Sequence, residues 1–333
     1  MPELRKDPLT GQWVIIGTER PRRPEDFRAV HEARQVGACM LCEGHESETP
    51  PELLAYRPSG DGTPNRQGWR VRVVPNKFPA LRVEGDLDRR GHGLYDLMNG
   101  VGAHELVIES PKHDETLATL SLAAIEDVVH AYQERMLDLR RDTRFRSVVI
   151  FKTAGRGIGP TLEHPHSQLL ATPTLPTDLA QELVQARTYH EYRERCVFCD
   201  ILNQETEEGR RIVAESEHVV AFAPFAGRAP FETWLMPRRH TAGYEQVKAV
   251  ERRDLARTLR GVLHRLHTLL EGAPFGLVLH SAPFADSEAP YFHWHIEIVP
   301  RVVVPGVLAA GSGFPMNPLP PEDAARFLRR DEA

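Results

Sequence analysis

The chain carries the same series of features twice, and this repeat restricts its fold more than any other property of the sequence. Each series begins with a C-x-x-C pair, "CMLC" or "CVFC", and continues with an apolar strand-like segment that runs into proline, basic residues and a histidine. A long helix, a short apolar strand and an H-x-H pair follow. The spacing from His113 to His164 is 164 − 113 = 51, and from His240 to His293 it is 293 − 240 = 53. The four features that follow each C-x-x-C pair in the same order predict an internal duplication with its joint near residues 177–190.

The order strand, strand, helix, strand, strand predicts an α+β fold rather than a parallel α/β sheet. We expect a duplicated fold of antiparallel sheets flanked by helices that pack on one face. Apolar residues recur every three or four positions over 122–139 and 255–269, which is typical of amphipathic helices. The predicted domains are residues 1–177 and residues 190–333.

Composition excludes several function classes. The chain has 333 residues, enough for two domains, and its formal net charge is 41 − 47 = −6, so no overall basic field favours nucleic acid as a partner. No run of 18 apolar residues predicts a membrane span, and the start lacks the apolar segment of a secretory signal. We therefore expect a cytoplasmic protein, in which paired cysteines suggest metal before disulfide.

Each series supplies two cysteines and two histidines, which is the ligand set of a closed tetrahedral zinc site. Four protein ligands leave no position for water, so the expected zinc is structural rather than catalytic, with two ions per chain. The predicted ligands are Cys39, Cys42, His113 and His164 for the first site, and Cys196, Cys199, His240 and His293 for the second.

Two alternatives to this assignment stay open. The cysteines of either pair could be buried thiols that meet by coincidence. A competing metal set could also gather in the second half, from Glu182, His280, His293 and His295. A single histidine at the end of a strand, such as His280, is more often a satisfied core residue than a ligand.

The segment "EHPHSQ" predicts the nucleophile of an enzyme. On a strand, His164, His166 and Gln168 would point to the same face. If His164 binds zinc, His166 is left free, and a neutral imidazole can attack phosphorus without a further base. Glycines at 155, 157 and 159 could bring backbone N–H groups close to a phosphate, although a plain loop is an equal alternative.

Gln168 distinguishes transfer from hydrolysis. The row resembles the H-x-H-x-H motif of histidine-triad nucleotide hydrolases and transferases, with glutamine at the third position. A third histidine could protonate a leaving group or help to activate water, whereas a glutamine amide can only hydrogen-bond a phosphate oxygen. A covalent nucleotidyl-histidine would then persist until a second phosphate attacks it.

Nearly end to end, the chain resembles the galactose-1-phosphate uridylyltransferase family of the histidine-triad superfamily. The resemblance rests on "DPLTGQWVIIGTERPRRP", "CMLC", "VVPNKFPAL", "ELVIESPKH", "HPHSQ", "PFETWLMPRRH" and "FHWHIEIVPR". It implies a ping-pong reaction. His166 would take UMP from UDP-glucose, release glucose 1-phosphate and pass UMP to a second sugar phosphate, with galactose 1-phosphate as the expected acceptor.

The resemblance also implies roles for other residues and a homodimer whose active site the partner chain completes. Arginines 20 and 23 would lie near phosphates, and Asn76 and Phe78 would hold the uridine. Gln168 would hold the transferred phosphate. The implied substrate-binding residues are Arg20, Arg23, Asn76, Phe78, Thr153, Gly155, Thr161 and Gln168.

Three departures from the family pattern keep the substrates open. Thr153 stands where the family often has asparagine, and Ala309 stands about where it has a sugar-binding glutamate. The second C-x-x-C pair resembles a two-zinc branch that includes plant-type ADP-glucose phosphorylases. An ADP-sugar phosphorylase and a histidine-triad hydrolase are therefore the alternative functions. A zinc protein that binds nucleic acid is disfavoured by the net charge and by the lack of a basic aromatic stripe.

Overall fold

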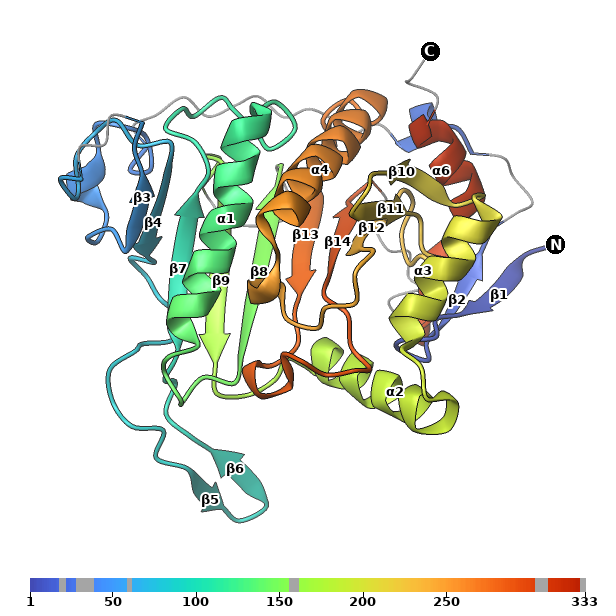
Figure 1. Ribbon diagram of the computed structural model, residues 1–333, viewed down its shortest axis with the longest axis horizontal. Coiled ribbons are helices and arrows are strands. Elements are labelled where there is room, and N and C mark those ends of the chain that lie inside the picture. The colour runs from blue at the N-terminus through green and yellow to red at the C-terminus, as the bar shows by residue number, and fades with distance from the viewer. Residues whose placement is uncertain (18–21, 28–38, 59–61, 156–161, 303–310, 330–333) are drawn as a thin grey trace.

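The computed structural model of the protein describes residues 1–17, 22–27, 39–58, 62–155, 162–302 and 311–329. A ten-stranded sheet forms the centre of the molecule (Figure 1). In spatial order its strands are β10 (Ile212–Glu215), β11 (Val219–Phe222), β12 (Thr233–Pro237), β14 (His295–Pro300), β13 (Phe275–His280), β8 (Ser147–Ala154), β9 (His166–Thr172), β7 (Ala103–Ile108), β4 (Val71–Pro75) and β3 (Leu54–Tyr56). Every neighbouring pair is antiparallel, so the predicted α+β class is confirmed.

The two halves of the sequence meet in the middle of this sheet. Strand β8 of the first half pairs with β13 of the second, and Lys152 lies opposite Leu277 in the register. Outward from this seam the order is β8, β9, β7, β4, β3 on one side and β13, β14, β12, β11, β10 on the other. The two orders correspond strand for strand, which is the arrangement expected of a duplication. The halves therefore share one continuous hydrogen-bonded sheet.

Two long helices lie side by side across one face of the sheet (Figure 1). They are α1 (Leu122–Leu139), from the first half, and α4 (Ala249–Leu269), from the second. The hydroxyl oxygen of Ser121 accepts a hydrogen bond from the Ala124 backbone N–H at 3.2 Å, which caps α1 at its start. Both helices hold an apolar stripe against the sheet, as their sequence periodicity predicts.

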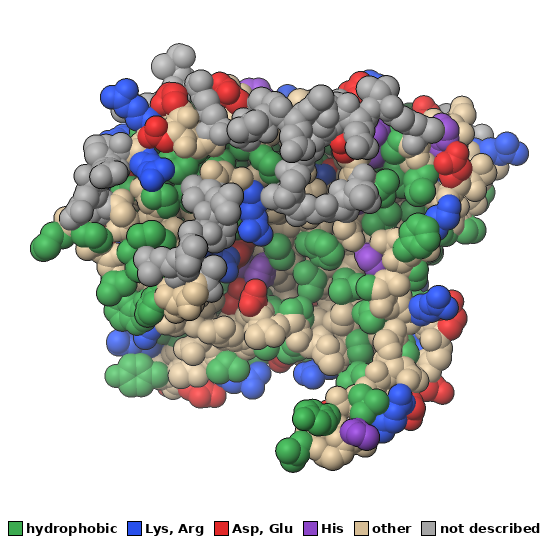
Figure 2. All heavy atoms as spheres, turned by 180° about the vertical axis from the view of Figure 1, so that it is seen from behind, with side chains coloured by type: hydrophobic (Ala, Val, Ile, Leu, Met, Phe, Trp, Pro, Cys, Tyr) green, Lys and Arg blue, Asp and Glu red, His purple; other side chains and the backbone are tan. Residues whose placement is uncertain are grey.

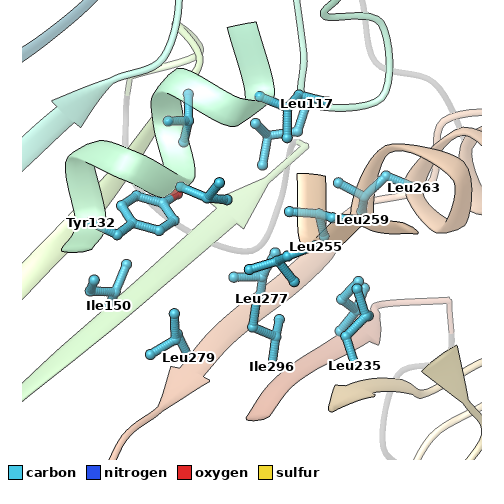
Figure 3. Close-up of a cluster of buried hydrophobic side chains, with 14 of the residues drawn as sticks. Leu117, Tyr132, Ile150, Leu235, Leu255, Leu259, Leu263, Leu277, Leu279 and Ile296 are labelled. Atoms are coloured by element: carbon cyan, nitrogen blue, oxygen red, sulfur yellow. The ribbon is translucent and has the colours of Figure 1, made fainter. Parts of the chain in front are cut away.

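The core between these helices and the sheet spans the seam (Figure 3). It includes Tyr132 of α1, Ile150 of β8, Leu255 of α4 and Leu279 of β13, each at most 2% exposed. Burying one such aliphatic side chain contributes about 1.5–3 kcal/mol to folding. Because side chains from both halves share this core, the helices stabilise the seam as well as their own strands.

Smaller elements surround the sheet. Strands β1 (Glu3–Lys6), β2 (Trp13–Ile16) and β15 (Met316–Asn317) form a second sheet, and β5 (Arg90–His92) and β6 (Tyr95–Leu97) form a hairpin that extends from the body (Figure 1). The remaining elements are α2 (Thr177–Arg193), α3 (Val197–Glu208), α6 (Pro321–Arg329) and the short 3₁₀ helices η1 (Pro24–Phe27), η2 (Glu46–Glu48), η3 (Tyr244–Gln246) and η4 (Phe284–Asp286).

Among the residues described, none of the helices combines the length and the apolar character that crossing a membrane requires.

Candidate active site and metal centres

Strand β9 separates core residues from candidate functional residues by simple alternation. Ser167, Leu169 and Ala171 are buried, and the hydroxyl of Ser167 lies 2.6 Å from that of Tyr132 on α1. His166 and Gln168 alternate with them and therefore point to the face opposite the helices. Figure 2 views the molecule from that side and shows a hollow in which histidine, acidic and basic side chains lie among apolar ones.

The imidazole of His166 is held in a form suited to nucleophilic attack. It is 4% exposed, and its Nδ1 lies 2.7 Å from the main-chain carbonyl oxygen of His164. A carbonyl only accepts, so Nδ1 carries the proton and the lone pair remains on Nε2. Burial lowers the pKa of His166, and the positive charge of Lys152 acts in the same direction, so the neutral imidazole is favoured.

A buried polar network lies beneath β9, and sequence reasoning missed it. The ammonium group of Lys152 donates to Glu109 at 2.7 Å and to the carbonyl oxygen of His166 at 3.0 Å. The Ser167 hydroxyl donates to the other carboxylate oxygen of Glu109. A lysine and a glutamate inside the apolar runs "SVVIFKTA" and "ELVIE" were the available sequence signal, because a charge in a buried strand requires a partner.

The side chain of Gln168 contacts a residue that the sequence analysis did not single out. Its Oε1 lies 2.8 Å from Nε2 of His104 on the neighbouring strand β7. The Asn76 side-chain nitrogen lies 3.1 Å from the same His104 nitrogen. The structure thus brings Asn76, implied to hold the nucleoside, beside Gln168, implied to hold the phosphate.

The other residues implied by the resemblance have varied surroundings. Phe78 is 79% exposed, so it is not a core residue. Arg23 is exposed and its backbone N–H donates to Asp26. Thr153 is half-buried on β8, two residues beyond Phe151, which pairs with Gln168. Arg20, Thr161 and Ala309, like Gly157 and Gly159, lie outside the described residues.

Gly155 has a backbone reason for being glycine. Its φ is +90°, in the region that residues with a side chain rarely adopt, and a Cβ atom there would lie 2.7 Å from the Cα of Pro274. Close packing between the two halves therefore requires glycine at this position, whatever it contributes to phosphate binding.

The structure gathers all four predicted ligands of the first metal site. The ligand atoms of Cys39, Cys42, His113 and His164 lie within 4.8 Å of one another. Sγ of Cys42 is 3.7 Å from Nδ1 of His113 and 3.5 Å from Nδ1 of His164. Tetrahedral zinc bonded to one sulfur and one nitrogen separates those atoms by roughly 3.5 Å. The cluster therefore has the dimensions of a metal centre.

The tautomer of His164 also suits a metal. Its Nε2 lies 2.7 Å from the carbonyl oxygen of Ser110, so Nε2 carries the proton and Nδ1 keeps its lone pair toward the cysteines. Burial lowers the pKa of His164 to about 4, which keeps the ring neutral, as a ligand must be.

The second predicted set, Cys196, Cys199, His240 and His293, repeats this arrangement. Its ligand atoms also lie within 4.8 Å of one another. Sγ of Cys199 is 3.3 Å from Nδ1 of His240 and 3.7 Å from Nδ1 of His293. The opposite ring nitrogens face the carbonyl oxygens of Ala289 and Arg239, at 3.1 and 3.0 Å, so both Nδ1 lone pairs face the thiols.

A third cluster corrects the competing set considered above. Glu182, His280 and His295 gather with Glu297, whereas His293 belongs to the second cysteine cluster. Nδ1 of His280 lies 3.0 Å from Glu182, while Nε2 of His295 is buried and has no hydrogen-bond partner in the described part of the chain. His280 is thus not an isolated core histidine. His293 precedes β14, whereas His295 and Glu297 lie on one face of that strand and so meet in the third cluster.

Two large cavities lie on the molecule. One, of about 1070 Å³, is lined by Asn76, Lys77, Arg82 and His104, and so adjoins Gln168 through His104. The other, of about 740 Å³, lies over β13 and β14, with His280 and Glu297 in its wall. None of the described lining of either cavity comes from β9, and the first cavity is linked to that strand through the contact between His104 and Gln168.

Comparison with known proteins agrees with this geometry. Residues 1–176 match the family described as "Galactose-1-phosphate uridyl transferase, N-terminal domain", and residues 182–303 match its C-terminal domain. The chain is 32% identical over 335 residues to the ADP-glucose phosphorylase of Arabidopsis thaliana, with 98% of this chain and 92% of that protein covered. It is 28% identical over 341 residues to the galactose-1-phosphate uridylyltransferase of Thermotoga maritima, covering 100% and 99%.

Solved structures show the same relationship. The crystal structure of an Arabidopsis thaliana ADP-glucose phosphorylase with bound ADP-glucose superposes with a TM-score of 0.82 at 30% identity, and 99% of each chain is covered. A structure described as a uridylyltransferase gives a TM-score of 0.77 at 25% identity, with 99% of this chain and 98% of that chain covered. The duplicated sheet, the candidate nucleophile strand β9 and matches to both family domains lead to one conclusion: the chain belongs to the galactose-1-phosphate uridyl transferase family.

Proposed function

We propose that the protein transfers UMP from UDP-glucose to a hexose 1-phosphate, galactose 1-phosphate above all, through a uridylyl group bound covalently to His166. The observation that carries this proposal is the tautomer of that residue. The hydrogen bond from Nδ1 to the His164 carbonyl leaves the Nε2 lone pair available without any base.

In the first step, Nε2 of His166 attacks the α-phosphorus of the donor. An N–P bond forms, and the P–O bond to glucose 1-phosphate breaks and leaves its electron pair on that oxygen. The attack moves no proton, because the imidazole is neutral beforehand and its Nδ1–H stays bonded to the His164 carbonyl. That carbonyl stabilises the positive charge that develops on the ring. In the second step, a phosphate oxygen of the acceptor forms the new P–O bond and the N–P bond breaks.

Gln168 suits transfer rather than hydrolysis. Its amide can donate hydrogen bonds to a non-bridging oxygen of the transferred phosphate, which lowers the barrier in both steps. The amide cannot transfer a proton to a leaving group, and it has no basic lone pair with which to activate water. The uridylyl-histidine therefore persists until a second phosphate arrives.

Zinc is the metal proposed for the two cysteine clusters. Two thiolates and two imidazoles form a closed tetrahedral set, in which the ion has a structural role. His164 is both a proposed zinc ligand and the residue whose carbonyl orients His166, so the first ion would hold the start of β9 in place. Thiolate ligands require reduced cysteines, which favours a cytoplasmic location. A homodimer is part of the same proposal, on the resemblance alone.

Adenylyl transfer is the second candidate function. In sequence, the chain is 32% identical to an ADP-glucose phosphorylase and 28% identical to a galactose-1-phosphate uridylyltransferase. In structure, the TM-scores are 0.82 for an ADP-glucose phosphorylase and 0.77 for a uridylyltransferase. In that reaction the donor would be ADP-glucose and the acceptor inorganic phosphate, with the same histidine as nucleophile.

Intact-protein mass spectrometry separates these reactions. The protein is mixed with UDP-glucose or with ADP-glucose without acceptor, and a His166→Gly variant is the control. A mass gain of one UMP in the parent protein alone supports the proposal, and the sugar phosphate that discharges the adduct identifies the acceptor. A gain from ADP-glucose alone transfers the assignment to the phosphorylase, and no gain from either donor contradicts both.

A further inference from the structure

We infer that His104 is a positioning residue that fixes the side-chain amide of Gln168, so that its NH₂ group rather than its oxygen faces the transferred phosphate. This inference deepens the proposed function and depends on it. His104 lies on β7, one strand away from Gln168, and lines the cavity of about 1070 Å³.

The tautomer of His104 follows from a backbone donor. The N–H of Ala80 donates to Nδ1 of His104 at 3.1 Å, and a backbone N–H cannot accept. Nδ1 must therefore present its lone pair, and the proton of the neutral ring is on Nε2. That Nε2–H lies 2.8 Å from Oε1 of Gln168 and donates to it.

The orientation of the Gln168 amide follows from this tautomer. With Oε1 directed at His104, the amide nitrogen is turned away from that ring, and within the described part of the chain its hydrogens can bond to phosphate oxygens. The reversed amide would place N–H against N–H at His104 and an oxygen against the negative phosphate. Without His104 the two orientations would have similar energies, and only one of them stabilises the transferred group.

Asn76 also faces His104 and does not satisfy it. The Phe78 backbone N–H donates to Oδ1 of Asn76 at 2.9 Å, which turns Nδ2 of Asn76 toward Nε2 of His104, at 3.1 Å. An amide nitrogen and a protonated imidazole nitrogen can only donate, so their contact is no hydrogen bond, and the Oε1 of Gln168 receives the His104 proton. The amide hydrogens of Asn76 remain available to a ligand on the same side.

The backbone around His104 is closely packed. The Asn76 N–H donates to the His104 carbonyl at 2.8 Å. A Cβ atom on Gly102 would lie 2.5 Å from the carbonyl oxygen of Ala171 on β9, so β7 and β9 approach closely beside this pair. The backbone positions of His104 and Gln168 are thus set by the sheet, and the Ala80 N–H fixes the His104 ring.

The test is a double-mutant cycle between His104 and Gln168. His104→Leu removes the donor, His104→Gln places an amide N–H about where Nε2 was, and Gln168→Ala removes the amide. Rapid-quench single-turnover kinetics measures the rates at which the nucleotidyl-enzyme forms and is discharged. Donor affinity is measured by calorimetry in the His166→Gly background, where no transfer occurs.

We expect His104→Leu to slow both steps by about 10- to 100-fold, somewhat less than the loss of a whole oxyanion donor. Donor affinity should change less than threefold, and His104→Gln should recover most of the rate. In the Gln168→Ala background, His104→Leu should have no further effect, because the group it orients is gone.

Three results would overturn the inference. They are an unchanged rate in His104→Leu, rate losses that multiply in the double variant, and a loss of affinity that accounts for the loss of rate. If His104→Leu does not fold, His104→Gln and a His104→Asn variant, whose shorter side chain cannot reach Oε1, take its place. If the parent protein forms the adduct and the His104→Leu variant forms and discharges it at the same rates, only this inference is contradicted. A parent protein that forms no adduct with either donor contradicts the proposed function, and this inference with it.

Discussion

The ammonium nitrogen of Lys152 lies 3.0 Å from the main-chain carbonyl oxygen of His166, and the same group forms a buried ion pair with Glu109 at 2.7 Å. Lys152 is 5% exposed and Glu109 is fully buried. A buried ion pair of this kind adds little to the free energy of unfolding, because the cost of removing both charges from water offsets their attraction. The pair instead fixes a position. Because Glu109 holds the Lys152 ammonium group in place, that group holds the backbone of β9 at His166.

Removal of Lys152 should be strongly destabilising. Among the described residues, Lys152→Met leaves the buried Glu109 carboxylate with the Ser167 hydroxyl as its one side-chain donor, so we expect a loss of about 3–5 kcal/mol in the free energy of unfolding. Urea denaturation at pH 7 measures it. Lys112→Met is the matched control, because Lys112 pairs with Glu115 but its side chain is 73% exposed, and its loss should cost less than about 1 kcal/mol. Equal losses in the two variants would contradict the role assigned to burial.

Each cysteine cluster should hold one zinc ion independently of the other. Cys42→Ser and Cys199→Ser should each lower the zinc content by about one ion per chain, since a serine hydroxyl is a poor replacement for a thiolate ligand. Elemental analysis of dialysed protein measures the content, and thermal unfolding should show a lower midpoint for each variant. Each variant is the other's control. A parent protein with no bound zinc, or a content that neither substitution changes, would exclude these ligand sets.

Gln168→His should convert part of the transfer into hydrolysis. An imidazole at this position can activate water, and such general base catalysis contributes roughly 10²–10⁴-fold. We therefore expect the nucleotidyl-enzyme to lose its nucleotide at least tenfold faster in the absence of acceptor, as followed by intact mass against time. Gln168→Leu, which removes the amide without supplying a base, is the control. An adduct in Gln168→His that lasts as long as in the parent protein would show that the glutamine does not protect it.

Acid should destabilise the protein partly through Glu52. Burial raises the pKa of this carboxyl, but hydrogen bonds from the side chains of Arg57 and Arg72 and from the Asn65 backbone outweigh it and hold the pKa below the ordinary value of 4.5. A lowered folded-state pKa contributes stability that is fully present above the ordinary pKa and is lost as pH falls below it. Glu52 should therefore add to the loss of unfolding free energy from about pH 5 downward.

Glu52→Gln tests this contribution. Urea denaturation at several pH values should show a variant that is less stable at neutral pH, because Arg72 is buried, and whose stability depends less on pH in the acid range. Glu217→Gln, at a side chain 85% exposed, should leave the slope unchanged. The same acid slope in Glu52→Gln and in the parent protein would assign the acid sensitivity to other carboxyls.

The sequence predicted the parts of the site that local patterns encode. The C-x-x-C pairs, the H-x-H pairs and the equal spacing of the repeats were enough to identify two four-residue clusters that the structure brings together. Strand alternation predicted that His166 and Gln168 share a face, and the structure shows that this face is opposite the helices. These features depend only on the period of a strand and on the spacing of a motif.

The residues that were missed depend on pairing between distant strands. His104 reaches Gln168 because β7 lies beside β9, and Lys152 reaches Glu109 from β8, so no periodicity within one segment could show either contact. The exchange of His293 for Glu297 has the same origin. His293, just before β14, lies in the second cysteine cluster, whereas His295 and Glu297 on β14 lie in the third cluster, and only the folded structure shows this division.

The seam between β8 and β13 makes each half the completion of the other. Expressed alone, either half would end in a strand whose backbone N–H and C=O groups face solvent, and exposed edges of this kind recruit other strands. Each half would also expose the apolar residues that the shared core now covers. Neither of the two similar units is therefore expected to be stable alone. The backbone hydrogen bonds of β8 and β13 join the two halves in the intact chain, and the same groups would promote aggregation of a separated half.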